Sequence, residues 1–290
     1  MDSKAKCHVR SISLPSRTHP LTSSVEEQFY KLRTLQAKST SSSSSSLRCR
    51  KLGGLKELYG RVDDLLQLPL TQQAISHERH GKWAEDVFDG SLRLLDMCGT
   101  TRDVFSQMKE CVQQLEPSLR RRKGGESSLE NDIGAYMISR KKLNKVISKC
   151  FTNLKRMENN CCTSDSDLMA VVGMLREVED ISFNAFESLL SSVSQPKVRS
   201  RLNSWSVVSK LLHPKRVSCE AEVEANEVEK IDAELLNLKS SKNINLVKVE
   251  KVLKGLKVME LTIQEAEEEL ECVFRQLVIA RVSLLNIFNH

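Results

Sequence analysis

Residues 249–287 read VEKVLKGLKVMELTIQEAEEELECVFRQLVIARVSLLNI. Apolar residues recur along this stretch at alternating spacings of three and four, which places them on one face of an α-helix. The positions of this apolar seam are Val249, Val252, Leu256, Met259, Ile263, Ala266, Leu270, Val273, Leu277, Ala280, Leu284 and Ile287. The sequence therefore predicts one C-terminal helix of about 44 residues, on the order of 65 Å long.

An apolar seam of this length has to pack against other helices. Shorter apolar stripes with helical spacing recur through the chain from Val25 onward. Aromatic residues make up only 4% of the 290 residues, whereas sheet proteins use more aromatic and β-branched residues. We predict an all-α fold, an elongated antiparallel helical bundle with a long C-terminal heptad helix. Closure of the seam against a second copy, giving a homodimer, is the alternative.

The rest of the sequence divides into a tail and one folded region. Residues 1–20 are basic and lack helical periodicity, so we predict a disordered tail. Residues 21–290 are predicted to form a single helical-bundle domain. It contains a serine-rich linker at residues 39–46 and irregular segments near residues 117–128, 158–165 and 195–218. Pro117 is expected to end the long helix that precedes it.

Basic residues are concentrated in two stretches, although the net charge of the chain is only +6. Residues 119–156 and 195–217 are strongly basic, and residues 220–234 are strongly acidic. One interpretation is a basic patch for nucleic acid or anionic lipid. The favoured interpretation is that basic and acidic helices lie side by side and neutralise each other. The candidate basic patch comprises Arg120, Arg121, Arg122, Lys123, Arg140, Lys141 and Lys142.

Composition also bears on partners and compartment. The low aromatic content argues against recognition of single-stranded nucleic acid, which uses stacking on aromatic rings. No stretch approaches the roughly 20 uncharged apolar residues of a membrane span, so we expect at most peripheral membrane contact. The nine cysteines are odd in number and form no C-x-x-C motif. With no secretory signal, this predicts free thiols in an intracellular, cytoplasmic protein, and the basic tail leaves a plastid as the alternative.

No motif for catalysis, cofactor binding or metal binding is recognisable. Gly53-Gly54 lacks the flanking strand of a phosphate-binding loop. His77 and His80 are spaced to share a helix face, but the sequence offers no obvious third and fourth zinc ligands. We therefore predict a non-enzymatic protein without a cofactor or a metal. An enzyme without recognisable motifs is a further alternative.

The tail contains one short motif with a physical mechanism. Residues 10–15 read R-S-I-S-L-P, the pattern that 14-3-3 proteins bind when the second serine is phosphorylated. A phosphate adds nearly two negative charges that an arginine cluster can bind. The candidate phospho-docking residues are Arg10, Ser11, Ser13 and Pro15, and the alternative is an ordinary basic tail.

Several stretches carry a family resemblance in a consistent order along the chain. They read HVRSISLPSR at 8–17, LPLTQQ at 68–73, DGSLRLLD at 89–96, SRKK at 139–142, WSVVSKL at 205–211, NEVE at 226–229 and RVSLLN at 281–286. The chain resembles a plant-specific family of helical proteins grouped with the BYPASS proteins of root and shoot development.

The resemblance implies a helical interaction or scaffold protein acting in plant developmental signalling, with no established catalytic activity or cofactor in the family. The residues themselves leave open another class of function, an anion- or phospholipid-surface-binding protein that uses its basic helices.

Overall fold

The computed structural model describes residues 20–38, 45–77, 81–121, 126–155, 167–194, 226–241 and 246–289. All regular secondary structure within these residues is helical, as predicted. The helices are α1 (Pro20–Lys38), α2 (Ser45–Leu66), α3 (Pro69–His77), α4 (Lys82–Arg121), α5 (Glu126–Lys155), α6 (Asp167–Val193), α8 (Glu227–Ser240) and α9 (Leu246–Asn289).

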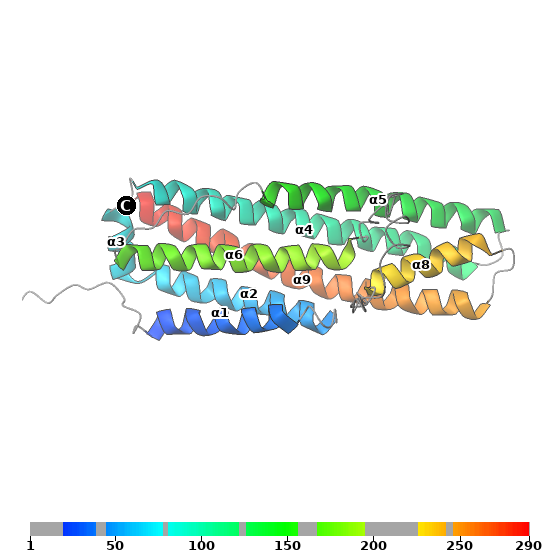
Figure 1. Cartoon of the computed structure of the whole chain (residues 1–290), viewed down its shortest axis with the longest axis horizontal. Helices are drawn as coiled ribbons and strands as arrows, with labels where there is room; N and C mark the ends of the chain where they lie inside the picture. The colour runs from blue at the N-terminus through cyan, green and yellow to red at the C-terminus, as the bar shows by residue number, and fades with distance from the viewer. Residues whose placement is uncertain are drawn as a thin grey trace, which may run out of the picture.

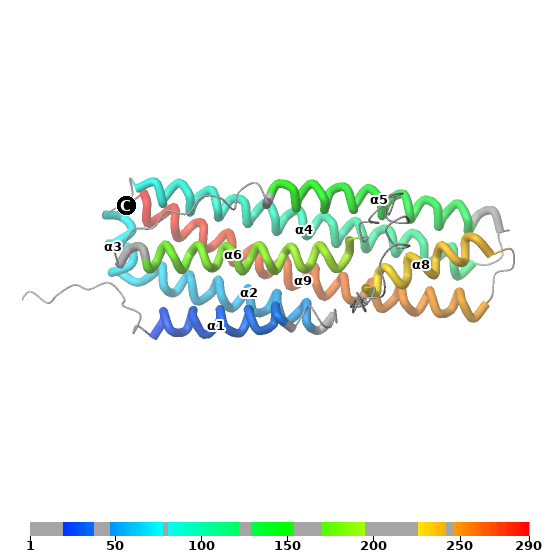
Figure 2. The backbone as a smooth tube through the Cα atoms, viewed as in Figure 1, coloured from blue at the N-terminus to red at the C-terminus, as the bar shows by residue number. Residues whose placement is uncertain are grey.

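The long helices lie along one axis and form an elongated antiparallel bundle (Figure 1). α4 and α9 run almost the whole length of the bundle and pack against each other. α1, α2 and α6 lie around one half of this pair, and α5 and α8 lie around the other half (Figure 2). The short helix α3 lies at the end of the bundle where the C-terminus is found.

The C-terminal helix has the length and the buried face that the heptad spacing predicts. α9 has 44 residues, and every position of the predicted apolar seam is buried. The seam packs against α2, α4 and α8 of the same chain and belongs to one continuous apolar core. Homodimer formation stays an untested alternative.

The end of α4 and the start of α2 differ from the sequence prediction. α4 continues through Pro117 and ends at Arg121. A proline removes one backbone hydrogen bond and disturbs the preceding turn, but only one turn follows here. Leu119 in that turn is 1% exposed, so its burial holds the turn against the core. α2 begins at Ser45, inside the predicted serine-rich linker, because buried Leu47 anchors its first turn.

The other irregular segments are only partly within the structure. α5 begins at Glu126, so the end of the predicted segment 117–128 is helical as well. The predicted tail, except for Pro20, the greater part of the serine linker and the predicted segments at 158–165 and 195–218 lie outside the described residues. Among the helices that the structure describes, none is long and apolar enough to cross a membrane.

Candidate functional site

The predicted basic patch is divided between the core and the surface. Arg140 is 0% exposed, while its neighbours Lys141 and Lys142 are exposed. Successive residues of a helix point about 100° apart, so neighbours in sequence reach different surroundings. The prediction of a surface position is therefore wrong for Arg140.

The remaining predicted residues are spread over the chain. Arg120 and Arg121 are exposed in the last turn of α4, and Arg120 is paired with Glu116 one turn earlier. Arg122 and Lys123 lie outside the described residues, and so do Arg10, Ser11, Ser13 and Pro15. Docking of a 14-3-3 protein therefore stays a prediction.

Arg140 lies where α4, α5, α6 and α8 meet. Its Nη2 and Nε donate to Asp232 Oδ2 of α8 at 3.1 and 3.2 Å. Its Nη1 donates to the backbone carbonyl of Val193, the last residue of α6, at 2.7 Å. The same nitrogen lies 3.6 Å from Met108 Sδ of α4. Tyr136, one turn before Arg140, donates its hydroxyl to Asp232 Oδ1 at 2.9 Å. We call these five residues the Arg140 cluster.

Local sequence explains why Asp232 reaches this position. Asn226 and Glu229 form a capping box at the start of α8: Asn226 Oδ1 accepts from the Glu229 N–H at 2.8 Å, and the Glu229 carboxylate accepts from the Asn226 N–H at 3.3 Å. A capping box fixes where a helix begins, which sets the face on which Asp232 lies.

The Arg140 cluster is closed to solvent and internally bonded. Asp232 is 7% exposed and Tyr136 is 3% exposed. Burial, reinforced by the charge of Asp232, raises the pKa of Tyr136 well above its ordinary value, so its phenol keeps the proton that it donates. A buried charge is tolerated when it is paired and hydrogen-bonded. The cluster therefore joins four helices and is not an open binding site.

The spacing of buried residues along α5 indicates that Arg140 is buried, whereas the basic composition of the segment does not. Position 140 falls within the buried stripe of α5, whose other members are Ile133, Tyr136, Leu143 and Ile147. A cation at a stripe position that is otherwise apolar or aromatic indicates a buried charge, and a buried charge requires a partner. The spacing predicts burial, but it does not name Asp232.

Several cations on other helices are paired between helices. Along the contact of α4 with α9, Arg102 lies 2.7 Å from Glu271 and Lys109 lies 2.9 Å from Glu267. We call these two pairs the α4–α9 ion-pair ladder. The acidic residues of α8 also pair with neighbouring helices: Glu227 with Arg48 of α2 and Glu234 with Lys251 of α9, at 3.7 and 2.5 Å. Arg48 and Lys251 lie outside the basic stretches 119–156 and 195–217, and the acidic stretch 220–234 is joined to the basic stretch 119–156 through Arg140 and Asp232.

The outer face of α5 is different. It carries four exposed lysines and two exposed apolar residues, which we call the α5 lysine face: Ile138, Lys141, Lys142, Lys145, Val146 and Lys149. Ile138 is 57% exposed and Val146 is 43% exposed. No acidic residue follows Asp132 in α5. Within the described part of the chain, none of the four ammonium groups has an ion pair or a hydrogen bond.

Sequence reasoning found only part of this face. It selected Lys141 and Lys142 from the basic run but left Ile138, Lys145 and Lys149 out of the candidate site. The overlooked signal is again the spacing, since positions 138, 142, 145 and 149 recur at three and four residues and share one side of the helix.

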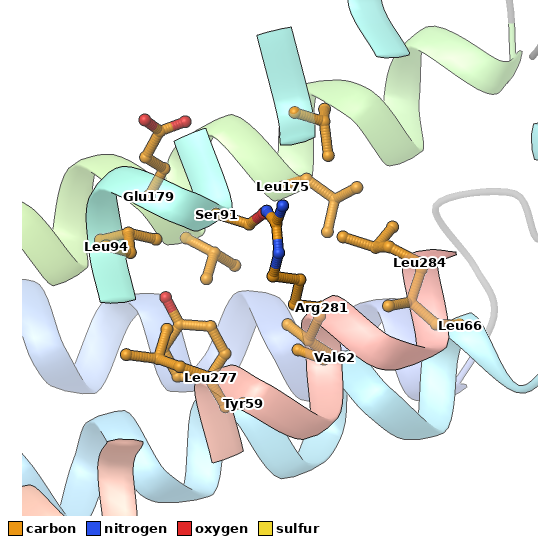
Figure 3. Close-up of a pocket in the computed structure, with 13 residues that line it drawn as sticks. Tyr59, Val62, Leu66, Ser91, Leu94, Leu175, Glu179, Leu277, Arg281 and Leu284 are labelled. Atoms are coloured by element: carbon orange, nitrogen blue, oxygen red, sulfur yellow. The ribbon is translucent and has the colours of Figure 1, made fainter. Parts of the chain in front are cut away.

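A small cavity lies in the opposite half of the bundle, between α2, α4, α6 and α9 (Figure 3). Its volume is about 40 Å³, and apolar side chains such as Leu94 and Leu277 form most of its wall. A volume of this size holds a few water molecules at most. It does not provide a site for a substrate of ordinary metabolite size.

The charged groups at the cavity are already bonded. Arg281 points towards Ser91 (Figure 3), and its Nη1 donates to Ser91 Oγ at 2.5 Å and to the Phe88 carbonyl at 2.8 Å. Glu179 accepts from Arg93 Nη2 at 2.7 Å. Burial nevertheless raises the pKa of Glu179 above its ordinary value, against the opposing effect of Arg93. These contacts join α6 and α9 to α4.

The described residues contain no group of three or more histidine, cysteine and acidic side chains placed to hold a metal ion. His77 is the last residue of α3, and His80 lies outside the described residues. The described cysteines are free thiols. Burial raises the pKa of Cys98, next to the seam, to about 12, which disfavours the reactive thiolate.

Comparison of the sequence with models of known protein families places the chain in one of them. A family model described as Protein BPS1 matches residues 51–287. The chain belongs to this family. The match begins within α2, ends in the last turn of α9, and includes the Arg140 cluster and the α5 lysine face. Membership of the Protein BPS1 family confirms the resemblance to the BYPASS group and relates the chain to plant development. No curated protein sequence and no solved structure matches the chain.

Proposed function

We propose that this member of the Protein BPS1 family is a non-enzymatic helical interaction protein in plant development, and that it binds an anionic partner through the α5 lysine face. The observation that carries the proposal is the set of four exposed lysines on one helix face without a counter-charge in the described part of the chain.

The energetics of the free helix support this function. Like charges three or four residues apart on a helix destabilise it by a few tenths of a kcal/mol per pair, about 0.2–0.5. Lys145 has such neighbours at Lys141, Lys142 and Lys149. An anionic partner removes this repulsion, so the free energy that the free protein loses to repulsion is recovered on binding.

The rest of the bundle is suited to presenting this face. α5 lies along the outer edge of the molecule (Figure 1), and its inner face is fixed to α4, α6 and α8 by the Arg140 cluster. Residues 138–149 span about 17 Å of helix at 1.5 Å per residue. A partner can therefore contact a straight, pre-ordered row of lysines without rearranging the core.

Affinity purification from plant tissue, read out by mass spectrometry, tests this proposal. The variant replaces four lysines with glutamine: Lys141, Lys142, Lys145 and Lys149. The matched control removes the same number of charges from exposed lysines of other helices: Lys56, Lys82, Lys248 and Lys254. We expect the wild type and the control to retain a common set of partners that the α5 variant loses. Retention of the same set by all three proteins would exclude the α5 lysine face as the binding surface.

A further inference from the structure

We infer that the anionic partner of the α5 lysine face is a membrane surface containing anionic phospholipid, on which the bundle lies with α5 against the headgroups. This inference rests on the proposed function and names the chemistry of its partner.

The type of cation favours a lipid surface over a protein. Protein–protein interfaces are enriched in arginine and aromatic residues and depleted in lysine. The cations of the α5 lysine face are all lysines, and the arginine of the same run, Arg140, is in the core. An ammonium group is a compact point charge, whereas a guanidinium group matches individual carboxylates and phosphates through paired hydrogen bonds. Point charges suit a diffuse anionic layer such as a leaflet rich in phosphatidylserine.

The two apolar residues favour a membrane over a nucleic acid. Ile138 and Val146 are exposed between the lysines. At a membrane surface such side chains enter the boundary between headgroups and acyl chains, while the lysine stems extend outward to the headgroups. A phosphate backbone offers no equivalent apolar layer, so exposed isoleucine and valine contribute little there.

The shape of the face agrees with a flat, extended partner. The face is the outward side of one helix at the edge of the bundle. The cavity described above lies between other helices, in the opposite half of the molecule. A convex helix side can rest on a lipid surface over the roughly 17 Å from Ile138 to Lys149.

The expected strength follows from the charges. A lysine near an anionic leaflet strengthens binding about fivefold, and the effect fades within a Debye length, about 8 Å at physiological salt. Four lysines together give on the order of several hundredfold. The attachment should therefore be reversible and sensitive to salt.

Vesicle co-sedimentation of the full chain tests the inference. One set of vesicles contains phosphatidylcholine alone, and the other contains equimolar phosphatidylserine and phosphatidylcholine. We expect binding only to the second set, decreasing as salt is added. Replacement of the four α5 lysines by glutamine should weaken binding more than about a hundredfold. The matched control variant at Lys56, Lys82, Lys248 and Lys254 should change it much less, although its net charge is identical.

A further variant separates apolar insertion from charge. Ile138→Ser keeps the net charge, and it should weaken binding to the phosphatidylserine vesicles while leaving the salt dependence unchanged. All of these substitutions are at exposed positions, so unchanged helical circular dichroism and melting temperature serve as the check on folding.

Three results would overturn the inference. Equal losses in the α5 variant and the matched control would show that net charge alone is responsible. Preferential binding to duplex DNA over the phosphatidylserine vesicles would indicate nucleic acid as the partner. Absence of vesicle binding by the wild type would also exclude the membrane. If the α5 variant still loses its partners in the affinity purification, that last result leaves the proposed function intact with a protein as the partner.

Discussion

The α4–α9 ion-pair ladder and the α5 lysine face both contain cations on long helices, but they use them in different ways. In the ladder, Arg102 and Lys109 each lie within hydrogen-bond distance of a glutamate of α9. On α5, Lys142 and Lys145 have no such partner in the described part of the chain. The ladder uses its charge to join two helices, whereas the ammonium groups of the α5 lysine face contact no carboxylate in the described part of the chain.

This difference shows that the number of charges in a segment does not predict its function. Three consecutive residues make the point most clearly, because Arg140 is buried and paired while Lys141 and Lys142 face outward. What matters is the helix face on which a charge lies and which helix, if any, packs against that face.

The largest effect is expected from breaking the buried pair. Arg140→Met leaves Asp232 buried without the Arg140 guanidinium, which costs about 3–5 kcal/mol of unfolding free energy. Urea denaturation measures this loss. The neighbouring substitution Lys141→Met provides the matched control, and because Lys141 is exposed its effect should stay within about 0.5 kcal/mol.

The same experiment has an internal check. Adding Asp232→Leu to Arg140→Met removes the carboxylate that has lost Arg140 and should restore part of the lost stability, because replacing both members of a buried ion pair is often tolerated. Equal stability of Arg140→Met and Lys141→Met would contradict the burial of Arg140.

A similar or slightly smaller effect is expected in the apolar seam. Leu270 is fully buried in the middle of α9, so Leu270→Ala should destabilise the fold by about 2–5 kcal/mol through lost burial and the cavity left behind. Leu261→Ala on the same helix is the control, since Leu261 is 54% exposed. Similar melting temperatures for the two variants would contradict the packing of α9 in the centre of the bundle.

The α4–α9 ion-pair ladder should contribute much less than either core site. Lys109 and Glu267 are partly exposed, and ion pairs of this kind contribute up to about 1 kcal/mol. A double-mutant cycle with Lys109→Met and Glu267→Gln should give a coupling energy of this size. The coupling should decrease as salt is raised, because solvent ions screen it. A coupling energy of zero at low salt would remove the distinction between the ladder and the α5 lysine face.

The smallest effect, with the opposite sign, is expected on α5. Lys149→Gln removes the repulsion between Lys149 and Lys145, so it should stabilise the free protein by a few tenths of a kcal/mol, about 0.2–0.5. Thermal unfolding at low salt detects this gain. A loss of stability would indicate that Lys149 has a counter-charge in the folded chain.

Sequence reasoning succeeded where one element determines the outcome. The spacing of three and four alone identified the buried side of α9, because a helix with that pattern has one side to bury. It failed where distant segments determine the outcome. Pro117 did not end α4, since burial of Leu119 outweighs a local preference.

Arg140 illustrates the same limit at the candidate site. Its partner Asp232 is 92 residues away along the chain, and its second partner, the Val193 carbonyl, is 53 residues away. The spacing of apolar residues in α5 indicates that position 140 is buried in the core. Only the packing of α8 against α5 identifies Asp232 as the group that neutralises its charge. For the same reason, the free lysines of α5 could be recognised only after the pairs of the other helices were known.

Arg140 also has a consequence for how the sequence can change. One guanidinium group binds both the end of α6, at Val193, and α8, at Asp232, so it holds together the two points between which residues 195–225 run. The end of α6 and the start of α8 are therefore both attached to α5 through one side chain, and a substitution that shortens this side chain releases the two attachments together.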